Sequence, residues 1–195
     1  MKMRYLAILP ILAACLAPLS SAQVPVFKFD KTKSRIGFNV KASVPISGKF
    51  DKWDATMTFT STDPRTGVLD IKAQADSVDT GSGMKDGKLK SKDFFDAEND
   101  PYITFHADKV VQTGPNTFDI PGTFTIRGVS KPQTLSMSVS GIGTGEGDIK
   151  GILAFDRKDY GMNSGIPFIK IADRVEVEVQ LHGKRISGPK LDIKQ

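Results

Sequence analysis

Few residues in this chain have the types and spacing that chemistry requires. His106 and His182 have no histidine, cysteine or carboxylate at metal-ligand spacing along the sequence, so structural roles are favoured over metal binding. Asp156 and Asp159 flank two basic residues and could act as an acid and a base, although charge balance at a strand end is the commoner reason for such a pattern. The sequence contains no zinc-protease motif, phosphate-binding glycine loop or nucleophile elbow.

A lysine-rich segment that ends in two adjacent aromatic residues, Phe94 and Phe95, is the most informative part of the chain. Residues 84–97 are the only mature part in which the hydrophobic rhythm departs from period two, so a short helical insert is predicted there. An insert that carries large apolar groups can cap an apolar space. Lys88 and Lys90 are candidates for attracting a phosphate or another polar head group, and a solvated helix face is the alternative.

The first 22 residues have the pattern of an export signal. Lys2 and Arg4 precede an apolar run over 5–17 that is too short to span a bilayer, and small residues precede a cleavage site after Ala22. We therefore expect a periplasmic protein. Lipoprotein processing at Cys15 is the rival reading, and cleavage after Ala22 would leave no cysteine in the mature chain.

The expected organisation is a signal peptide over 1–22, one barrel domain over 23–185 and a polar, loosely held tail over 186–195. Removing Lys2 and Arg4 lowers the formal net charge from +5 to +3. This charge is too small to indicate a nucleic-acid partner. Neither a metal nor a cofactor is expected.

Alternation of apolar and polar residues dominates the remainder, as in Ile36, Phe38 and Val40 and again from Val175 to Leu181. Such segments are half-buried strands with one face in water. Short turns rich in glycine and proline separate them, which favours antiparallel neighbours. The pattern predicts an all-β sandwich or closed barrel, with strands near 26–30, 34–42, 49–60, 66–76, 102–112, 117–127, 133–143, 148–157 and 174–184.

Five segments, in order, resemble the YceI-like family of periplasmic polyisoprenoid-binding proteins. They are 29–38, 48–53, 89–96 with Pro101 and Phe105, 124–132, and 157–162. The resemblance covers about Val26 to Gly183 and implies an extended, antiparallel, eight-stranded lipocalin-like barrel with one short helix. Its lumen would hold a long isoprenoid chain. One departure is that Lys41 and Ala42 stand where the family often has a histidine.

The resemblance and the alternation together give a set of candidate ligand contacts. The predicted lumen residues are Phe38, Val40, Met57, Phe59, Phe105, Phe124, Ile126, Met137, Phe155 and Val177, and the predicted mouth or lid residues are Trp53, Phe94, Phe95, Met162 and Phe168. Core packing is the alternative role for each inward side chain.

The leading hypothesis is a non-catalytic binder or carrier of an isoprenoid lipid, such as a polyprenyl phosphate or an isoprenoid quinone. A small enzyme acting on a prenyl-lipid head group near Asp156 and Asp159 is the second hypothesis, and a ligand-free structural or stress-related barrel is the third. Transient membrane contact and a homodimer are further expectations about partners.

Overall fold

The computed structural model describes residues 23–43, 45–165 and 169–194. These residues form one antiparallel sheet of twelve strands, together with an α-helix and three short 3-10 helices. The strands are β1 (Val26–Phe29), β2 (Arg35–Ala42), β3 (Ile46–Phe50), β4 (Trp53–Thr58), β5 (Val68–Gln74), β6 (Val78–Asp79), β7 (Tyr102–Ala107), β8 (Val111–Gly114), β9 (Thr117–Ile126), β10 (Val129–Val139), β11 (Glu146–Asp156) and β12 (Ile171–Ser187). The helices are α1 (Gly83–Lys90), η1 (Pro64–Thr66), η2 (Ala75–Ser77) and η3 (Arg157–Tyr160).

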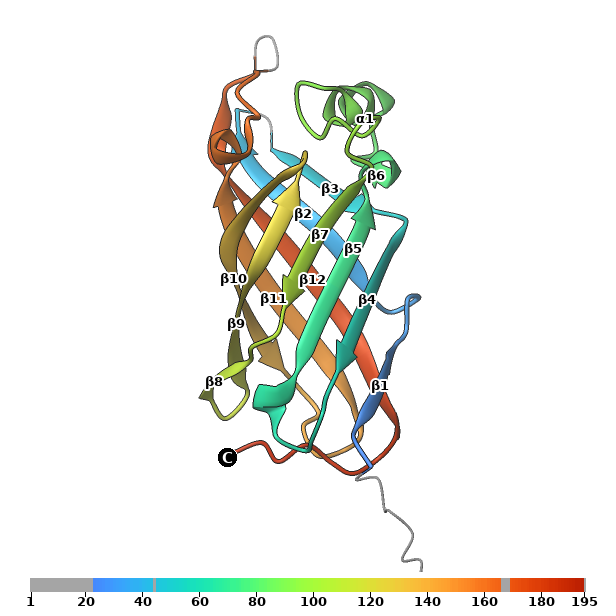
Figure 1. Ribbon diagram of the computed structural model, residues 1–195. Coiled ribbons are helices and arrows are strands. Elements are labelled where there is room, and N and C mark those ends of the chain that lie inside the picture. The colour runs from blue at the N-terminus through green and yellow to red at the C-terminus, as the bar shows by residue number, and fades with distance from the viewer. Residues whose placement is uncertain (1–22, 44, 166–168, 195) are drawn as a thin grey trace, which may run out of the picture.

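The sheet curls into an elongated barrel with tilted strands (Figure 1). Its hydrogen-bonded order is β4-β5-β7-β9-β10-β11-β12-β2-β3-β6. The strands at one end of this order, β4 and β5, are joined directly in the chain to the strands at the other end, β3 and β6. β3 passes into β4 through Asp51 and Lys52, and β5 passes through η2 into β6. Bonds from Asp51 N to Ser77 O (3.1 Å) and from Gln74 N to Lys52 O (2.8 Å) carry the pairing across the bend. Each pair of segments therefore acts as one bent strand.

The predicted eight-stranded barrel is confirmed once these bends are considered. β2 and β1 lie one after the other along the same edge of β12, and β8 is a short addition that pairs with β9. Bends let a strongly coiled sheet close, and they interrupt the ladder where they occur. The sequence pattern cannot show these interruptions because alternation continues on both sides of each bend.

Strand alternation builds the interior. In β5, Leu69, Ile71 and Ala73 are buried, whereas Asp70 and Lys72 between them are exposed. Successive side chains of a strand point to opposite faces, so every strand contributes alternate residues to the barrel core. None of the helices in the described ranges has the length and apolarity needed to cross a bilayer.

Two local predictions need correction. The insert predicted as helical over 84–97 is helical only as far as Lys90, and turns follow. The turn predicted over 128–132 consists of Arg127 and Gly128, both with positive φ (54° and 68°), and β10 already begins at Val129. Pro132 is tolerated there because the upper part of β10 pairs only with β9.

The C-terminal tail, predicted to be loosely held, crosses the lower end of the barrel (Figure 1). Asp192 N donates to Thr62 O (2.8 Å), and Gln112 Nε2 donates to Lys194 O (2.6 Å). Ile193 packs against the core. Apolar residues such as Ile193 attach the tail to the barrel, although the tail is polar overall. The high proportion of polar residues therefore conceals this attachment in the sequence.

Candidate functional site

The upper half of the barrel encloses an apolar cavity of about 80 Å³. A single water molecule requires about 10–15 Å³ measured in the same way, so the space is several times larger than one water. Among the lining residues only Thr104 and Arg157 are polar. The others are Ile36, Phe38, Val40, Ile46, Phe50, Ile71, Ala73, Leu89, Phe94, Phe95, Ile103, Phe105, Phe124, Ile126, Leu135, Leu153, Phe155, Met162, Ile171, Val175, Val177 and Val179. Apolar cavities of this kind stay dry and accept apolar ligands.

A lid, residues 83–100, lies at the upper end of the barrel (Figure 1), and three of its side chains line the cavity. Leu89, Phe94 and Phe95 from the lid are each less than 8% exposed. The Phe95 ring packs on Phe38 and Phe50, with centroid distances of 6.1 and 6.0 Å. Rings in such tilted and edge-to-face contacts anchor the lid by hydrophobic burial. As expected for an insert with large apolar groups, this segment caps an apolar space.

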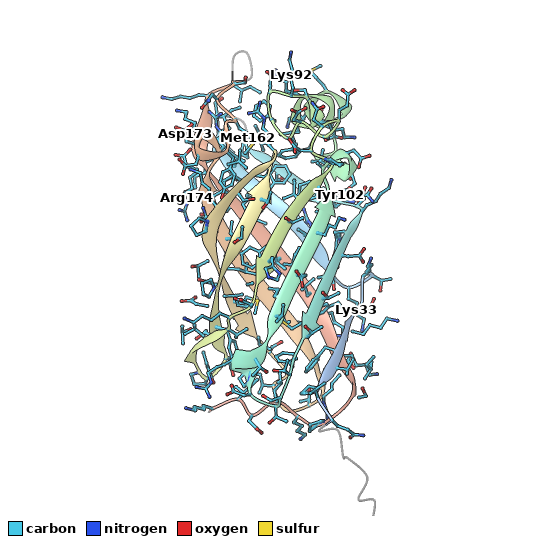
Figure 2. All side chains as sticks on the ribbon, in the orientation of Figure 1. Lys33, Lys92, Tyr102, Met162, Asp173 and Arg174 are labelled. Atoms are coloured by element: carbon cyan, nitrogen blue, oxygen red, sulfur yellow. The ribbon has the colours of Figure 1, made fainter. Side chains whose placement is uncertain are left out.

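Arg127 fastens the lid from the other side of the mouth. Its guanidinium donates to the carbonyl oxygens of Lys92 (2.7 Å) in the lid and of Gly161 after η3. Lys92 and Met162, which follows Gly161, both lie at the upper end of the barrel in Figure 2. This arginine could not be found from the sequence, because only the folded hairpin brings it between two distant loops.

Arg157 is the buried charged residue of the cavity wall, at 7% exposed. It donates to the carbonyl oxygens of Met162, Ser164 (2.9 Å) and Ala172 (3.3 Å), and it pairs with Asp173 at 3.0 Å. The pKa of Asp173 is lowered, first by a hydrogen bond from Lys158 and then by the charges of Lys158 and Arg157. The guanidinium thus joins η3, the following loop and β12.

The carboxylates considered for acid–base chemistry have structural partners. Asp156 caps η3 by accepting from Lys158 N at 2.8 Å, and Asp159 lies 3.7 Å from Lys131 Nζ.

Tyr160, which ends η3, is fully buried against Phe124, and burial raises the pKa of its hydroxyl. Its ring lies next to the upper part of β10, which has no ladder to β11.

The predicted head-group lysines differ in their surroundings. Lys88 Nζ bonds to Asp93 at 2.5 Å and lies 5.9 Å from the centroid of the Phe94 ring. The hydrogen bond from Lys88 lowers the pKa of Asp93. Lys90 ends α1 and is half-buried, and within the described part of the chain no carboxylate lies within 4.0 Å of its Nζ. Lys88 is therefore already neutralised, whereas Lys90 is not.

A second apolar cavity, of about 140 Å³, occupies the lower half of the barrel. The Gly-rich loop over 141–147 and the C-terminal tail border it. The lining residues are Phe27, Phe29, Met57, Phe59, Pro64, Val110, Phe118, Met137, Val139, Ser140, Gly141, Ile142, Gly143, Gly145, Glu146, Gly147, Ile149, Gly183, Arg185, Lys190, Leu191 and Ile193.

A septum of four inward residues separates the two cavities. Leu69, Ala107, Ile120 and Leu181 are at most 3% exposed and line neither cavity. Leu69 pairs with Ala107 across β5 and β7, which places them at one level. One continuous lumen was expected from the alternation and the family resemblance, but the packed septum divides the interior in two.

The predicted lumen residues are divided accordingly. Met57, Phe59 and Met137 line the lower cavity, and the other seven line the upper one. Of the predicted mouth residues, Phe94, Phe95 and Met162 line the upper cavity. Trp53 lines neither cavity, and it is half-buried beneath Lys31 Nζ at 5.7 Å. Phe168 lies outside the described residues.

Both histidines pair with carboxylates from other strands, which their sequence neighbours could not reveal. His106 Nδ1 lies 2.7 Å from Asp70, and His182 lies 2.7 Å from both Asp148 and Glu146. Hydrogen bonds to Asp148 and then to Glu146 raise the pKa of His182. Across 23–43, 45–165 and 169–194, no cluster of three or more candidate side chains is arranged to hold a metal.

A closed antiparallel barrel with an apolar interior under a lid defines a lipocalin-like barrel as the class of fold. A profile described as "YceI-like domain" matches residues 27–183, and the chain belongs to this family. The resemblance predicted from five segments is thereby confirmed.

The chain is similar to curated bacterial proteins named "UPF0312 protein". One from Pseudomonas aeruginosa is 26% identical over 183 residues, covering 89% of this chain and 94% of the relative. One from Pectobacterium atrosepticum is 31% identical over 132 residues, covering 66% and 68%. The match to a Pseudomonas syringae relative is 32% identical over 98 residues and spans about half the length of each chain.

Two solved structures share the architecture. Burkholderia cenocepacia BcnA has a TM-score of 0.72 and 26% identity, covering 80% of this chain and 99% of BcnA. A polyisoprenoid binding domain from Saccharophagus degradans has a TM-score of 0.65 at 16% identity, covering 83% and 99%. The second likeness shows the fold alone.

Proposed function

We propose that this protein binds the chain of an isoprenoid lipid in the upper cavity and carries or sequesters it without catalysis. The observation that supports the proposal most is the closed cavity beneath the lid, whose lining is apolar except for Thr104 and Arg157. The structural neighbour described as a polyisoprenoid binding domain supports the choice of ligand. The export signal expected over 1–22 supports a periplasmic setting.

Hydrophobic burial is sufficient to drive such binding. Each buried methylene contributes about 0.8 kcal/mol, so roughly ten to fifteen of them contribute ~8–12 kcal/mol before the costs of association. A micromolar dissociation constant corresponds to about 8.2 kcal/mol net, so burial alone supplies it only where association costs no more than about 4 kcal/mol. Cavity shape rather than polar contacts would then set selectivity, which should be loose.

A long chain needs more space than the upper cavity contains in this conformation. The boundary that yields in this proposal is the lid, which the Phe95 ring anchors on Phe38 and Phe50, whereas the buried septum below limits the chain. The head group would remain near the lid, where Lys90 has no carboxylate within 4.0 Å among the described residues. In this proposal Lys90 attracts a phosphate head group.

The test uses a matched pair of substitutions on β11. Leu153 points into the cavity and is 3% exposed, whereas its neighbour Ile152 points outward and is 53% exposed. Protein purified from cells and titrated with an isoprenoid quinone is examined by native mass spectrometry. We expect Leu153→Trp to lose the bound lipid mass and Ile152→Trp to retain it, with circular dichroism checking the fold. Equal retention by both folded variants contradicts an upper-cavity site.

Lys90→Gln tests the head-group part of the proposal. It should weaken binding of a prenyl phosphate while leaving an uncharged quinone unaffected. An equal effect on both ligands removes the head-group role and leaves the chain-binding role intact.

A further inference from the structure

The rim of the lower cavity carries positive charge that no carboxylate of residues 23–43, 45–165 and 169–194 neutralises. Arg185 and Lys190 line the cavity, and in the described ranges no carboxylate oxygen lies within 4.0 Å of either. Glu146 is the acidic residue of this lining, but His182 Nε2 (2.7 Å) and Lys184 Nζ (3.9 Å) already pair with it. The hydrogen bond from His182 lowers the pKa of Glu146. Two cationic side chains therefore face the cavity mouth.

Within the described part of the chain, the guanidinium of Arg185 has donors without a partner. One of its nitrogens donates to Gly188 O, and the backbone N of the same residue donates to Gly145 O at 2.7 Å. The arginine of the upper cavity is different, since Arg157 contacts three carbonyl oxygens and Asp173. The two cavities thus differ in electrostatics as well as position: the upper one is neutral and the lower one attracts an anion.

The cover of the lower cavity is lightly attached. Leu191 and Ile193 of the tail are only half-buried where they line it. The side-chain hydrogen bonds that hold the end of the tail, Thr62 Oγ1 to Asp192 (2.5 Å) and those between Gln112 and Lys194, are exposed. A segment with few buried contacts and exposed hydrogen bonds opens at low free-energy cost. A ligand can therefore enter from this end without disturbing the lid.

We propose that the lower cavity is a second binding site, for a single-chain amphiphile with an anionic head group such as a medium-chain fatty acid. The alkyl chain would lie against Met57, Phe59 and Met137, where flexible methionines adapt to the ligand. The carboxylate would bind at Arg185 and Lys190 through charge-assisted hydrogen bonds. No lining residue is common to both cavities and the septum lies between them, so this site does not depend on isoprenoid binding.

Isothermal titration calorimetry with decanoate and its uncharged counterpart decanol tests whether the positive charges at the rim contribute to binding. The Arg185→Gln, Lys190→Gln double variant should bind decanoate about tenfold more weakly, while its affinity for decanol stays within about threefold. Lys150→Gln, on the exposed surface of β11, is the matched control and should alter neither affinity. Absence of decanoate binding to the wild type at millimolar concentration overturns the proposal, as does an equal loss for decanoate and decanol.

Filling each cavity in turn tests the location. Met137→Trp should abolish decanoate binding, and Leu153→Trp, which fills the upper cavity, should leave it unchanged. Loss caused by folded Leu153→Trp but not by Met137→Trp would place decanoate above the septum and refute the lower site.

Native mass spectrometry of the wild type then tests whether the upper and lower cavities are separate binding sites. Where an isoprenoid quinone binds, a ternary complex with one quinone and one decanoate is expected, and one-for-one displacement overturns a separate site. If no isoprenoid binds, calorimetry with decanoate still shows whether the lower cavity binds an anionic amphiphile. Failure of the proposed isoprenoid function can therefore be told apart from failure of the lower site.

Discussion

Replacing Ile120 by alanine should join the two cavities and destabilise the barrel strongly. Ile120 is 0% exposed and lies on β9 between Phe118 of the lower cavity and Phe124 of the upper one. Removing three carbon atoms forfeits about 2.4 kcal/mol of hydrophobic transfer free energy. Unrelaxed space of about 60–80 Å³, at about 24 cal/mol per Å³, adds about 1.5–2 kcal/mol. We expect the free energy of unfolding to fall by about 4 kcal/mol.

Urea unfolding followed by circular dichroism measures this change, provided that the slope against denaturant stays constant. Ile152→Ala is the matched control, because it removes the same atoms from a side chain that is 53% exposed on the outside of β11. It should change the free energy of unfolding by no more than about 0.5 kcal/mol. The contrast isolates burial from the chemistry of the substitution.

The same variant tests whether the septum limits the bound chain. Affinity of the wild type for isoprenoid quinones should stop rising once the chain reaches the septum, and Ile120→Ala should move that limit to longer chains. A destabilisation below about 1 kcal/mol would refute the packed septum. An unchanged chain-length limit in a folded variant would show that the septum already yields to the ligand.

Three further predictions concern the supports of the barrel. Because the pKa of His182 is raised in the folded state, its ion pairs contribute their full stability below about pH 6.5, and this contribution is lost as pH rises through the raised pKa. His182→Gln should therefore make the free energy of unfolding decline less between about pH 6 and about pH 9, as measured by urea unfolding. Gly128→Ala should cost about 1–3 kcal/mol in thermal unfolding, since φ is +68° and the new Cβ would lie 2.9 Å from Asp100 Oδ1; no loss would contradict the strained turn. Arg157→Met should cost about 3 kcal/mol or more in urea unfolding by leaving Asp173 and three carbonyl oxygens without this donor, and a neutral result would show that they find other partners.

The lid shows how far local sequence signals extend. The break in period two and the pair Phe94-Phe95 predicted an apolar cap, and both rings are buried at the top of the upper cavity. The helical length was overestimated because the pattern does not reveal that Phe95 N bonds back to Leu89 O at 2.9 Å, which turns the chain after α1. Arg127, which holds the lid, has no local signal.

The sequence by itself determined the strands and their inward faces, because a period of two follows from strand geometry alone. That periodicity left a sandwich or a closed barrel, and only the resemblance to the YceI-like family indicated the barrel. Tertiary structure alone decided how that interior is divided. Whether Leu69 and Ile120 meet as a septum depends on strand register and barrel stagger, which set the level of each inward side chain. The same register brings His182 to Asp148 and Glu146, although more than 30 residues separate them along the chain.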